Sequence, residues 1–298
     1  MWNSERWAGF ELREDDIIIS TPPKCGTTWM QMQCALLVFR TPDLPGPLST
    51  LSPWLDMNTR PLADVLADLA AQTHRRFIKT HTPLGELPWD ERVTYLHVGR
   101  DPRDVAMSWD NHVANTDVEH LFDLRAAAVG LDDLGELGID GPPPPRSDDR
   151  EVRFWEWMEV EGADLGTSGL TTLVAHSGGF WDARERPNVH LFHYTDMQVD
   201  LPGQMTRLAL ALGVDPPDDD LVEAARFAAM KARAHELVPN ADVQLFESSS
   251  QFFDRARSGD WRALIGDEGL PRYETALGST SADDGHVAWL HGGWLGTT

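Results

Sequence analysis

The stretch that decides the fold of this chain reads Thr21-Pro22-Pro23-Lys24-Cys25-Gly26-Thr27-Thr28-Trp29. It follows an apolar run at residues 16–20 and leads into residues 29–38, which carry the pattern of a helix. This order predicts a buried strand, a tight loop and a helix. Ligands of open α/β sheets bind at such junctions, at the carboxyl ends of the strands.

The composition of this loop predicts a phosphate-binding site. Gly26 lets backbone N–H groups close around an anion, and the N-terminus of the helix favours negative charge. Lys24 adds a positive charge, and Thr27 and Thr28 add hydroxyl groups. In the common nucleotide-hydrolase loop the lysine follows the last glycine and directly precedes a magnesium-binding Ser or Thr. Here Lys24 precedes Gly26, which disfavours a metal-bound nucleoside triphosphate; the alternative to a phosphate site is a capped turn with a surface lysine.

A second strand-to-helix junction supplies another anion-binding pair. Residues 93–98 alternate and are rich in β-branched side chains, which predicts a strand, and Pro102 suits the start of the next helix. Arg100 at the strand end and Ser108 two turns into the helix can both face the loop above the sheet. Arginine offers a planar fork that suits phosphate, and serine offers a short donor. The alternative is an exposed helix start held by surface ion pairs.

A third junction places a base beside a cation. Residues 75–83 contain a short apolar strand that ends in Lys79 and His81, and side chains two residues apart share one face of a strand. An imidazole with a pKa near 6.5 can accept a proton from a hydroxyl at neutral pH. No comparable context surrounds His97, His112, His176 or His193.

The whole chain shows an α/β pattern. Strands are predicted near 16–21, 75–81, 93–100 and 188–194. Helices are predicted near 27–39, 61–72, 102–115, 151–160, 203–212 and 219–234. The alternation predicts a central parallel sheet with helices on both faces. We expect a single domain over residues 1–298, although two small domains also fit this length. Residues 116–150, acidic and ending in a tetraproline run, are expected to form a mobile loop rather than a helix.

Together the three junctions resemble the donor-binding motifs of cytosolic-type sulfotransferases that use 3′-phosphoadenosine 5′-phosphosulfate (PAPS). The resemblance spans residues 12–262 and implies a P-loop-like α/β fold. In that family the loop holds the 5′-phosphate end of the donor, which here implies Lys24, Cys25, Gly26, Thr27 and Thr28, and the tryptophan, here Trp29, stacks on adenine. Bacterial glycolipid sulfotransferases are especially similar, through residues 44–49, 52–56 and 75–84.

The same resemblance assigns roles at the other two junctions. Arg100 and Ser108 match the 3′-phosphate motif position for position, and His81 occupies the Lys-Thr-His context of the catalytic base. Lys24 and Lys79 would then neutralise charge on the sulfuryl group and the departing phosphate. The product of the donor would be 3′-phosphoadenosine 5′-phosphate (PAP), and no metal is required.

Three downstream segments extend the resemblance with differences. Tyr194 follows the last predicted strand and is expected beside adenine, and Phe227 occupies the position of a phenylalanine that lines the adenine pocket. The segment 252–261 resembles the stretch that closes over the 3′-phosphate, but Asp254 and Ala256 replace its arginine and first glycine. Arg255 replaces the lysine of that stretch, and Arg257 is expected to restore the lost positive charge.

Composition limits the partners. A net charge of −23 disfavours nucleic acid and anionic membranes as partners. No stretch reaches the 18 apolar residues of a membrane span, so we expect a cytoplasmic protein without stable membrane insertion. The acceptor is expected to be a hydroxylated small molecule, lipid or glycolipid. The sequence does not distinguish among these acceptors, and it does not indicate an oligomeric state. Two alternatives remain at this point: an ATP-dependent phosphotransferase on the same fold, and a non-catalytic nucleotide-binding protein.

Overall fold

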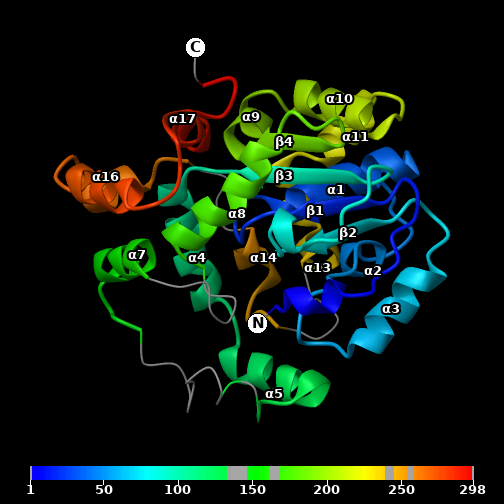
Figure 1. The fold of residues 1–298 in the computed structure, drawn as a ribbon, viewed down its shortest axis with the longest axis horizontal. Helices are drawn as coiled ribbons and strands as arrows, with labels where there is room; N and C mark the ends of the chain where they lie inside the picture. The colour runs from blue at the N-terminus through cyan, green and yellow to red at the C-terminus, as the bar shows by residue number, and fades with distance from the viewer. Residues whose placement is uncertain are drawn as a thin grey trace.

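Four parallel strands form the centre of the computed structural model, which describes residues 2–132, 134, 146–160, 168–238, 245–253 and 258–296 (Figure 1). The strands are β1 (Ile17–Ser20), β2 (Phe77–Thr80), β3 (Thr94–Gly99) and β4 (Val189–His193). They lie in the order β2-β1-β3-β4, so β1 and β3 are central. All four predicted strands are therefore confirmed, and their ends differ from the predicted bounds by two residues or fewer.

Alternating side chains of these strands supply two hydrophobic cores, one on each face of the sheet. Ile18 pairs with Ile78 and Tyr95, and all three belong to the first core. Ile17 and Ile19, the neighbours of Ile18 in β1, belong to the second core. Because strands buried on both faces read as continuous apolar runs, the triple isoleucine at residues 17–19 is the expected signature of a central parallel strand.

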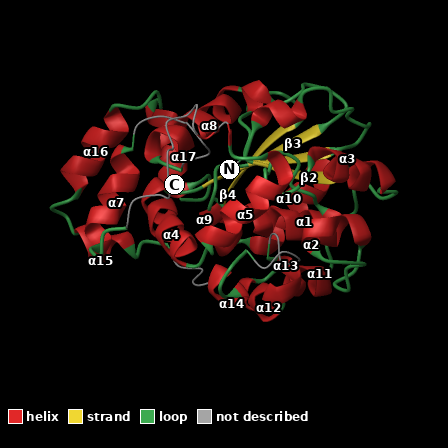
Figure 2. Ribbon diagram, turned by 90° about the horizontal axis from the view of Figure 1, so that it is seen from below, coloured by secondary structure: helices red, strands yellow, loops and turns green. Residues whose placement is uncertain are grey.

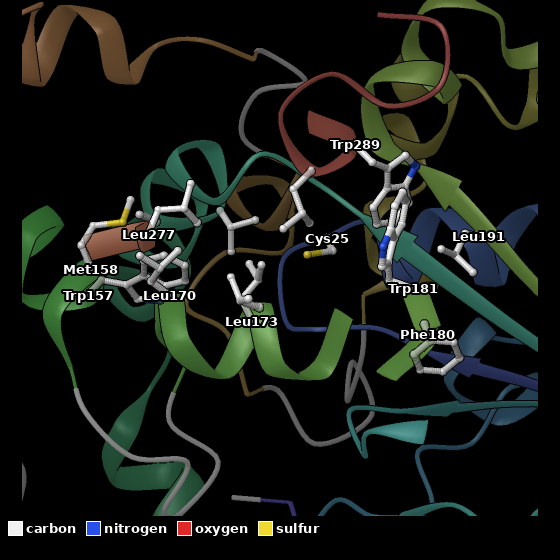
Figure 3. Close-up of a cluster of buried hydrophobic side chains, with 14 of the residues drawn as sticks. Cys25, Trp157, Met158, Leu170, Leu173, Phe180, Trp181, Leu191, Leu277 and Trp289 are labelled. Carbon is white, nitrogen blue, oxygen red and sulfur yellow. The ribbon is translucent and has the colours of Figure 1, made fainter. Parts of the chain in front are cut away.

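Helices cover both faces, as predicted (Figure 2). The helices that supply the second core are α1 (Thr27–Phe39), α2 (Leu48–Leu51), α9 (Tyr194–Val199), α10 (Leu201–Leu212), α11 (Asp219–Ala224), α12 (Phe227–Ala232) and α13 (Ala234–Leu237). The helices that supply the first core are η1 (Ser4–Trp7), α3 (Leu62–Ala71), α4 (Pro102–Ala114), α7 (Arg150–Glu159), α8 (Leu170–Asp182), α15 (Trp261–Ile265), α16 (Leu270–Gly278) and α17 (Asp284–Gly292). Figure 3 shows part of this first core, where Trp181 and Trp289 lie close to each other. Outside these lists are η2 (Leu84–Glu86), α5 (Val118–Val129) and α14 (Ser249–Phe252).

The loop expected at residues 116–150 is in part a helix, so that prediction was wrong for its first half. Helix α5 occupies Val118–Val129, and the Asp117 carboxylate caps it by accepting a hydrogen bond from the backbone N–H of His120 at 2.9 Å. The loop was predicted from the tetraproline run at the end of the segment. The residues of α5 itself are rich in Leu and Ala, which are good helix formers. The prolines themselves lie outside the described residues.

The single helix predicted at 219–234 is broken into α11, α12 and α13, which corrects that expectation. The first break falls at Arg226, whose backbone is extended with φ −66° and ψ 144°, and the second falls at Arg233, with φ −104° and ψ 21°. Just before Arg226, the Ala225 carbonyl accepts a hydrogen bond from Trp29 Nε1 at 2.8 Å. A tertiary contact from α1 thus takes a carbonyl that a continuous helix would use.

Candidate active site

One cavity of about 580 Å³ lies at the carboxyl edge of the sheet. The loops after all four strands contribute to it, together with α1, α4 and α12. Of the sequence-predicted site residues, those that line it are Lys24, Gly26, Thr27, Thr28, Trp29, Lys79, His81, Arg100, Ser108, Tyr194 and Phe227. Arg255 and Arg257 lie outside the described residues, as do Asp254 and Ala256. The three motifs between Lys24 and Ser108 therefore meet at one cavity, and the downstream residues Tyr194 and Phe227 join them there.

The loop after β1 is held in a left-handed backbone conformation. Lys24 has φ +68° and Gly26 has φ +108°, and only glycine adopts such angles freely. A Cβ atom at Gly26 would also lie 3.0 Å from Tyr194 Cδ2. The first N–H groups of α1 have no partner within the helix, and the residues that carry them, Thr27 and Thr28, line the cavity.

Lys24 is half-buried at the cavity. Its Nζ lies 4.6 Å from the centroid of the Phe252 ring, and its backbone carbonyl accepts a hydrogen bond from Arg100 at 2.9 Å. Burial, and then the charge of Arg100, lowers the pKa of Lys24 to about 7. No salt bridge within the described part of the chain neutralises Lys24, Lys79 or Arg100. Desolvated cations without acidic partners are unstable unless an anion binds, so the cavity suits an anionic ligand.

Lys79 also faces the cavity, over an aromatic ring. Its Nζ is 3.5 Å from the centroid of the Trp54 ring, and its backbone N–H donates to the Pro53 carbonyl at 3.2 Å. Burial lowers the pKa of Lys79 to about 7, against the opposing effect of Asp56. The cation–π contact fixes the ammonium group at the cavity surface.

The hydrogen bond of His81 defines its tautomer. Nδ1 lies 2.6 Å from the carbonyl oxygen of Thr21, and because a carbonyl only accepts, Nδ1 carries the proton. Nε2 therefore keeps a free lone pair. The edges of Trp54 and Trp2 confine the ring, at centroid distances of 4.8 and 5.3 Å. Burial, followed by the charge of Lys79, holds the pKa of His81 well below its usual value, so the ring is neutral at neutral pH.

A buried carboxylate supports the turn that carries His81. Asp56 accepts hydrogen bonds from Thr80 Oγ1 at 2.7 Å, from Thr82 Oγ1 at 2.8 Å and from the backbone N–H of His81 at 3.2 Å. Burial raises the pKa of Asp56, and these hydrogen bonds oppose that effect. The carboxylate thus fixes three consecutive residues at the end of β2.

Aromatic rings and an arginine form the far end of the cavity. The Arg100 guanidinium lies 4.1 Å from the centroid of the Tyr194 ring, and Trp29 meets Tyr194 edge to face at 5.3 Å. Ser108 lies on α4, on the face that also presents Asp104 one turn earlier. Burial raises the pKa of Asp104, whose carboxylate accepts a hydrogen bond from the backbone N–H of Gly259 at 2.7 Å.

A family model described as the sulfotransferase domain matches residues 14–277 of this chain. The chain belongs to the sulfotransferase family. It is 41% identical over 314 residues, covering 99% of this chain and 94% of the relative, to a glycolipid sulfotransferase of Mycobacterium bovis (strain BCG / Pasteur 1173P2). It is also 41% identical, over 313 residues and with the same coverage, to a glycolipid sulfotransferase of Mycobacterium tuberculosis (strain ATCC 25618 / H37Rv). The chain is therefore a sulfotransferase enzyme.

Solved structures agree on the fold of this sulfotransferase. Retinol dehydratase in complex with androsterone and PAP matches with a TM-score of 0.66 and 21% identity, over 94% of this chain and 85% of that chain. Mouse sulfotransferase SULT7A1 complexed with PAP matches with a TM-score of 0.63 and 21% identity, over 93% and 90%. At this level of identity the matches establish the α/β fold.

Cys25 is the one predicted site residue in the described loop whose side chain turns away from the cavity of the sulfotransferase. The thiol is completely buried in the first core, among the apolar side chains of Figure 3. Burial raises the pKa of the Cys25 thiol to about 12, which excludes a reactive thiolate at neutral pH. The Cys25 thiol lies in the first core and Lys24 lines the cavity, so the two side chains point to different sides of the backbone.

Several residues of the sulfotransferase cavity were missed from sequence. Trp2 gave no signal, since it lies far from every motif, and Trp54 was noted only as a similarity in a loop. Asp56, in the same loop, does not line the cavity but supports the turn that carries His81. The outer part of the cavity is mainly apolar and is lined by Trp109, Val113, Val118, Leu121, Phe122, Leu134, Leu245 and Phe246.

Among the described residues, no group of His, Cys, Asp or Glu side chains is arranged to hold a metal ion. Within the same ranges, no helix is long and apolar enough to cross a membrane.

Proposed function

We propose that this sulfotransferase moves the sulfuryl group of PAPS to a hydroxyl group of a glycolipid-like acceptor, with His81 as the general base. One observation carries the proposal: Lys24, Lys79 and Arg100, which form no salt bridge with any described residue, line the same cavity as the neutral ring of His81. A donor with phosphate groups at both ends of an adenosine would supply the missing negative charge at two places.

The cavity divides between the parts of the donor. The loop from Lys24 to Thr28 would bind the 5′-phosphosulfate end, where N–H groups and hydroxyls gather at the start of α1. Arg100 and Ser108 would bind the 3′-phosphate. The aromatic side chains of Trp29, Tyr194 and Phe227 line the same cavity and would contain the adenine. The PAP complexes of the structural relatives support this choice of donor.

The free lone pair of His81 suits the proton transfer. Nε2 would take the proton of the acceptor hydroxyl as that oxygen forms its bond to sulfur and the bond from sulfur to the 5′-phosphate oxygen breaks. Lys24 and Lys79 would stabilise the charge that develops on the transferring group and on the departing phosphate. The pair Nδ1–H and Thr21 carbonyl holds the imidazole in the tautomer that this step requires.

The apolar outer part of the cavity supports an acceptor with a hydrocarbon portion. Its walls come from α4, α5 and the segment around Phe246. The relatives at 41% identity are named as glycolipid sulfotransferases, which supports a glycolipid acceptor for this chain.

Donor binding and turnover test the proposal in two steps. Titration calorimetry with PAP is expected to show binding, and transfer of labelled sulfuryl from PAPS to a glycolipid is expected to follow. His81→Ala should lower turnover on the order of a hundredfold with little change in PAP affinity, because its ring acts on the acceptor proton. Lys24→Ala should lower turnover by at least a similar factor and also weaken PAP binding.

The exposed His235 gives a matched control, since it lies on α13 outside the cavity. His235→Ala should match the wild type in both measurements. Near-normal rates for both His81→Ala and Lys24→Ala would refute the proposal. Magnesium-dependent turnover of ATP would favour a phosphotransferase, and PAP binding without transfer to any hydroxyl would indicate a non-catalytic nucleotide-binding protein.

A further inference from the structure

A second imidazole faces the cavity and has no role in the reaction described above. His112 lies on α4 one turn after Ser108, so both side chains project from the same face of the helix. Three aromatic rings surround it: Trp109 at 5.5 Å, Phe246 at 5.4 Å and Phe252 at 6.2 Å between centroids.

The ring of His112 lacks hydrogen-bond partners. Nδ1 is enclosed and has no partner in the described residues, whereas Nε2 is not enclosed and also has no protein partner there. A polar atom that opens on a cavity and has no protein partner is available to a bound molecule. Because Nδ1 is sealed among the aromatic rings, Nε2 is the atom that a ligand in the cavity can reach.

The position of His112 is close to the reacting end of the cavity. Lys24 Nζ and the His112 ring both lie against Phe252, at 4.6 and 6.2 Å from its centroid. His112 therefore stands one aromatic ring away from the cation that would hold the 5′-phosphosulfate end. Burial, followed by the charges of Lys24 and Lys79, keeps the pKa of His112 well below its usual value. A neutral imidazole nitrogen either donates or accepts a hydrogen bond, and a hydroxyl group complements both.

We propose that His112 binds a second oxygen of a polyhydroxylated acceptor while the first oxygen lies at His81. This inference rests on the proposed function and narrows the acceptor to a glycosyl or other polyol head with an apolar tail. A monohydric lipid would leave His112 unpaired in a mostly aromatic wall. Because an analogue without the hydroxyl leaves the polar group of the site unpaired, sites that pair with a substrate hydroxyl discriminate against such analogues.

Two acceptors with the same tail test the inference. Octyl glucoside presents several hydroxyl groups, and 1-octanol presents one. The measured quantity is the ratio of kcat/KM for the glucoside to kcat/KM for octanol, with PAPS as donor. His112→Phe keeps an aromatic ring but removes both nitrogens, and is expected to lower this ratio about tenfold, the effect of one lost hydrogen bond. His112→Asn, which can still donate and accept, should restore part of the ratio.

Binding provides a readout that does not depend on turnover. In titrations of octyl glucoside into the PAP complex, His112→Phe should weaken the glucoside about tenfold and leave PAP affinity within about twofold. His235→Phe, on the exposed face of α13, should change neither quantity.

The outcomes separate this inference from the proposed function. If His112→Phe lowers transfer to glucoside and octanol by the same factor, or leaves the glucoside unaffected, the role of His112 is overturned while the sulfotransferase reaction stands. If the wild type binds PAP but transfers to neither acceptor, the proposed function and this inference fail together.

Discussion

Lys24 and Lys79 are two of only three lysines in the chain, and both face the cavity. Burial lowers the pKa of each to about 7, so each is only partly protonated at neutral pH before an anion binds. Lysine is suited to this condition because its pKa shifts readily on burial, whereas arginine stays charged. The third lysine, Lys231, is exposed on α12.

Donor affinity should therefore depend on pH above neutrality. Because PAP binds to the protonated form, its dissociation constant should rise as the pH increases above about 7, by up to about tenfold per pH unit for one proton taken up. Calorimetry between pH 7 and 9 measures this slope. Lys24→Arg is the matched variant, since its guanidinium keeps its charge and should flatten the slope. A wild-type dissociation constant that stays level over this range would contradict the assignment of Lys24 to the donor.

Single residues were predictable from sequence where a motif fixes both the residue type and the spacing. Lys24, Arg100 and His81 each follow a strand end, so the fold itself carries them to one edge. His112 and Cys25 were not predictable. His112 matters because one of its ring nitrogens is unpaired among aromatic rings, and the direction of the Cys25 thiol follows from core packing. Neither property is visible in a local sequence pattern.

At the scale of elements, the end of β2 depends on one carboxylate that lies in a different loop. Asp56 receives hydrogen bonds from Thr80, Thr82 and the backbone of His81, and it is completely buried. The strands were predictable because they are buried on both faces. The first break in 219–234 was not, because it lies next to a hydrogen bond from Trp29 on another helix, which no local pattern shows. The contact of Asp56 with β2 is of the same non-local kind.

Removing this carboxylate should disturb both stability and catalysis. Asp56→Ala leaves three donors without an acceptor, and the free energy of unfolding should fall by about 2–4 kcal/mol, measured by urea denaturation. Turnover should fall further than PAP affinity, since the turn that positions His81 is released while the loop after β1 stays in place. Asp68→Ala, which removes the exposed partner of Arg60, should cost less than about 1 kcal/mol. Equal losses for the two variants would argue against a supporting role for Asp56.

At the scale of the whole molecule, a buried histidine network joins the sheet to α8 and, through the 2.9 Å contact of Ser177 Oγ with His286 Nε2, to α17. Ser20 Oγ donates to the Thr82 carbonyl at 2.6 Å, so His176 Nε2, 3.2 Å from Ser20 Oγ, must be the donor in that pair. His97 Nδ1 donates to the Ser20 carbonyl at 3.0 Å, so its Nε2 accepts from Ser177 Oγ at 3.2 Å. Each ring is neutral in one tautomer, and His176 Nδ1 is buried without a partner. The network has no place for an additional proton.

This network should make the molecule sensitive to acid. Burial lowers the pKa of His176 to about 3, so below about pH 6.5 the unfolded chain binds a proton that the folded chain refuses. The stability that His176 contributes is complete above pH 6.5 and is lost as the pH falls from there towards 3, by up to about 1.4 kcal/mol per pH unit. His176→Gln keeps an N–H donor for Ser20 but cannot titrate, so between pH 7 and 5 its free energy of unfolding should fall by about 2 kcal/mol less than that of the wild type. Urea denaturation at pH 7, 6 and 5 measures the difference, with the exposed His235→Gln expected to follow the wild type. Parallel curves for His176→Gln and the wild type would show that His176 takes up its proton equally in both states, against the burial that defines the network.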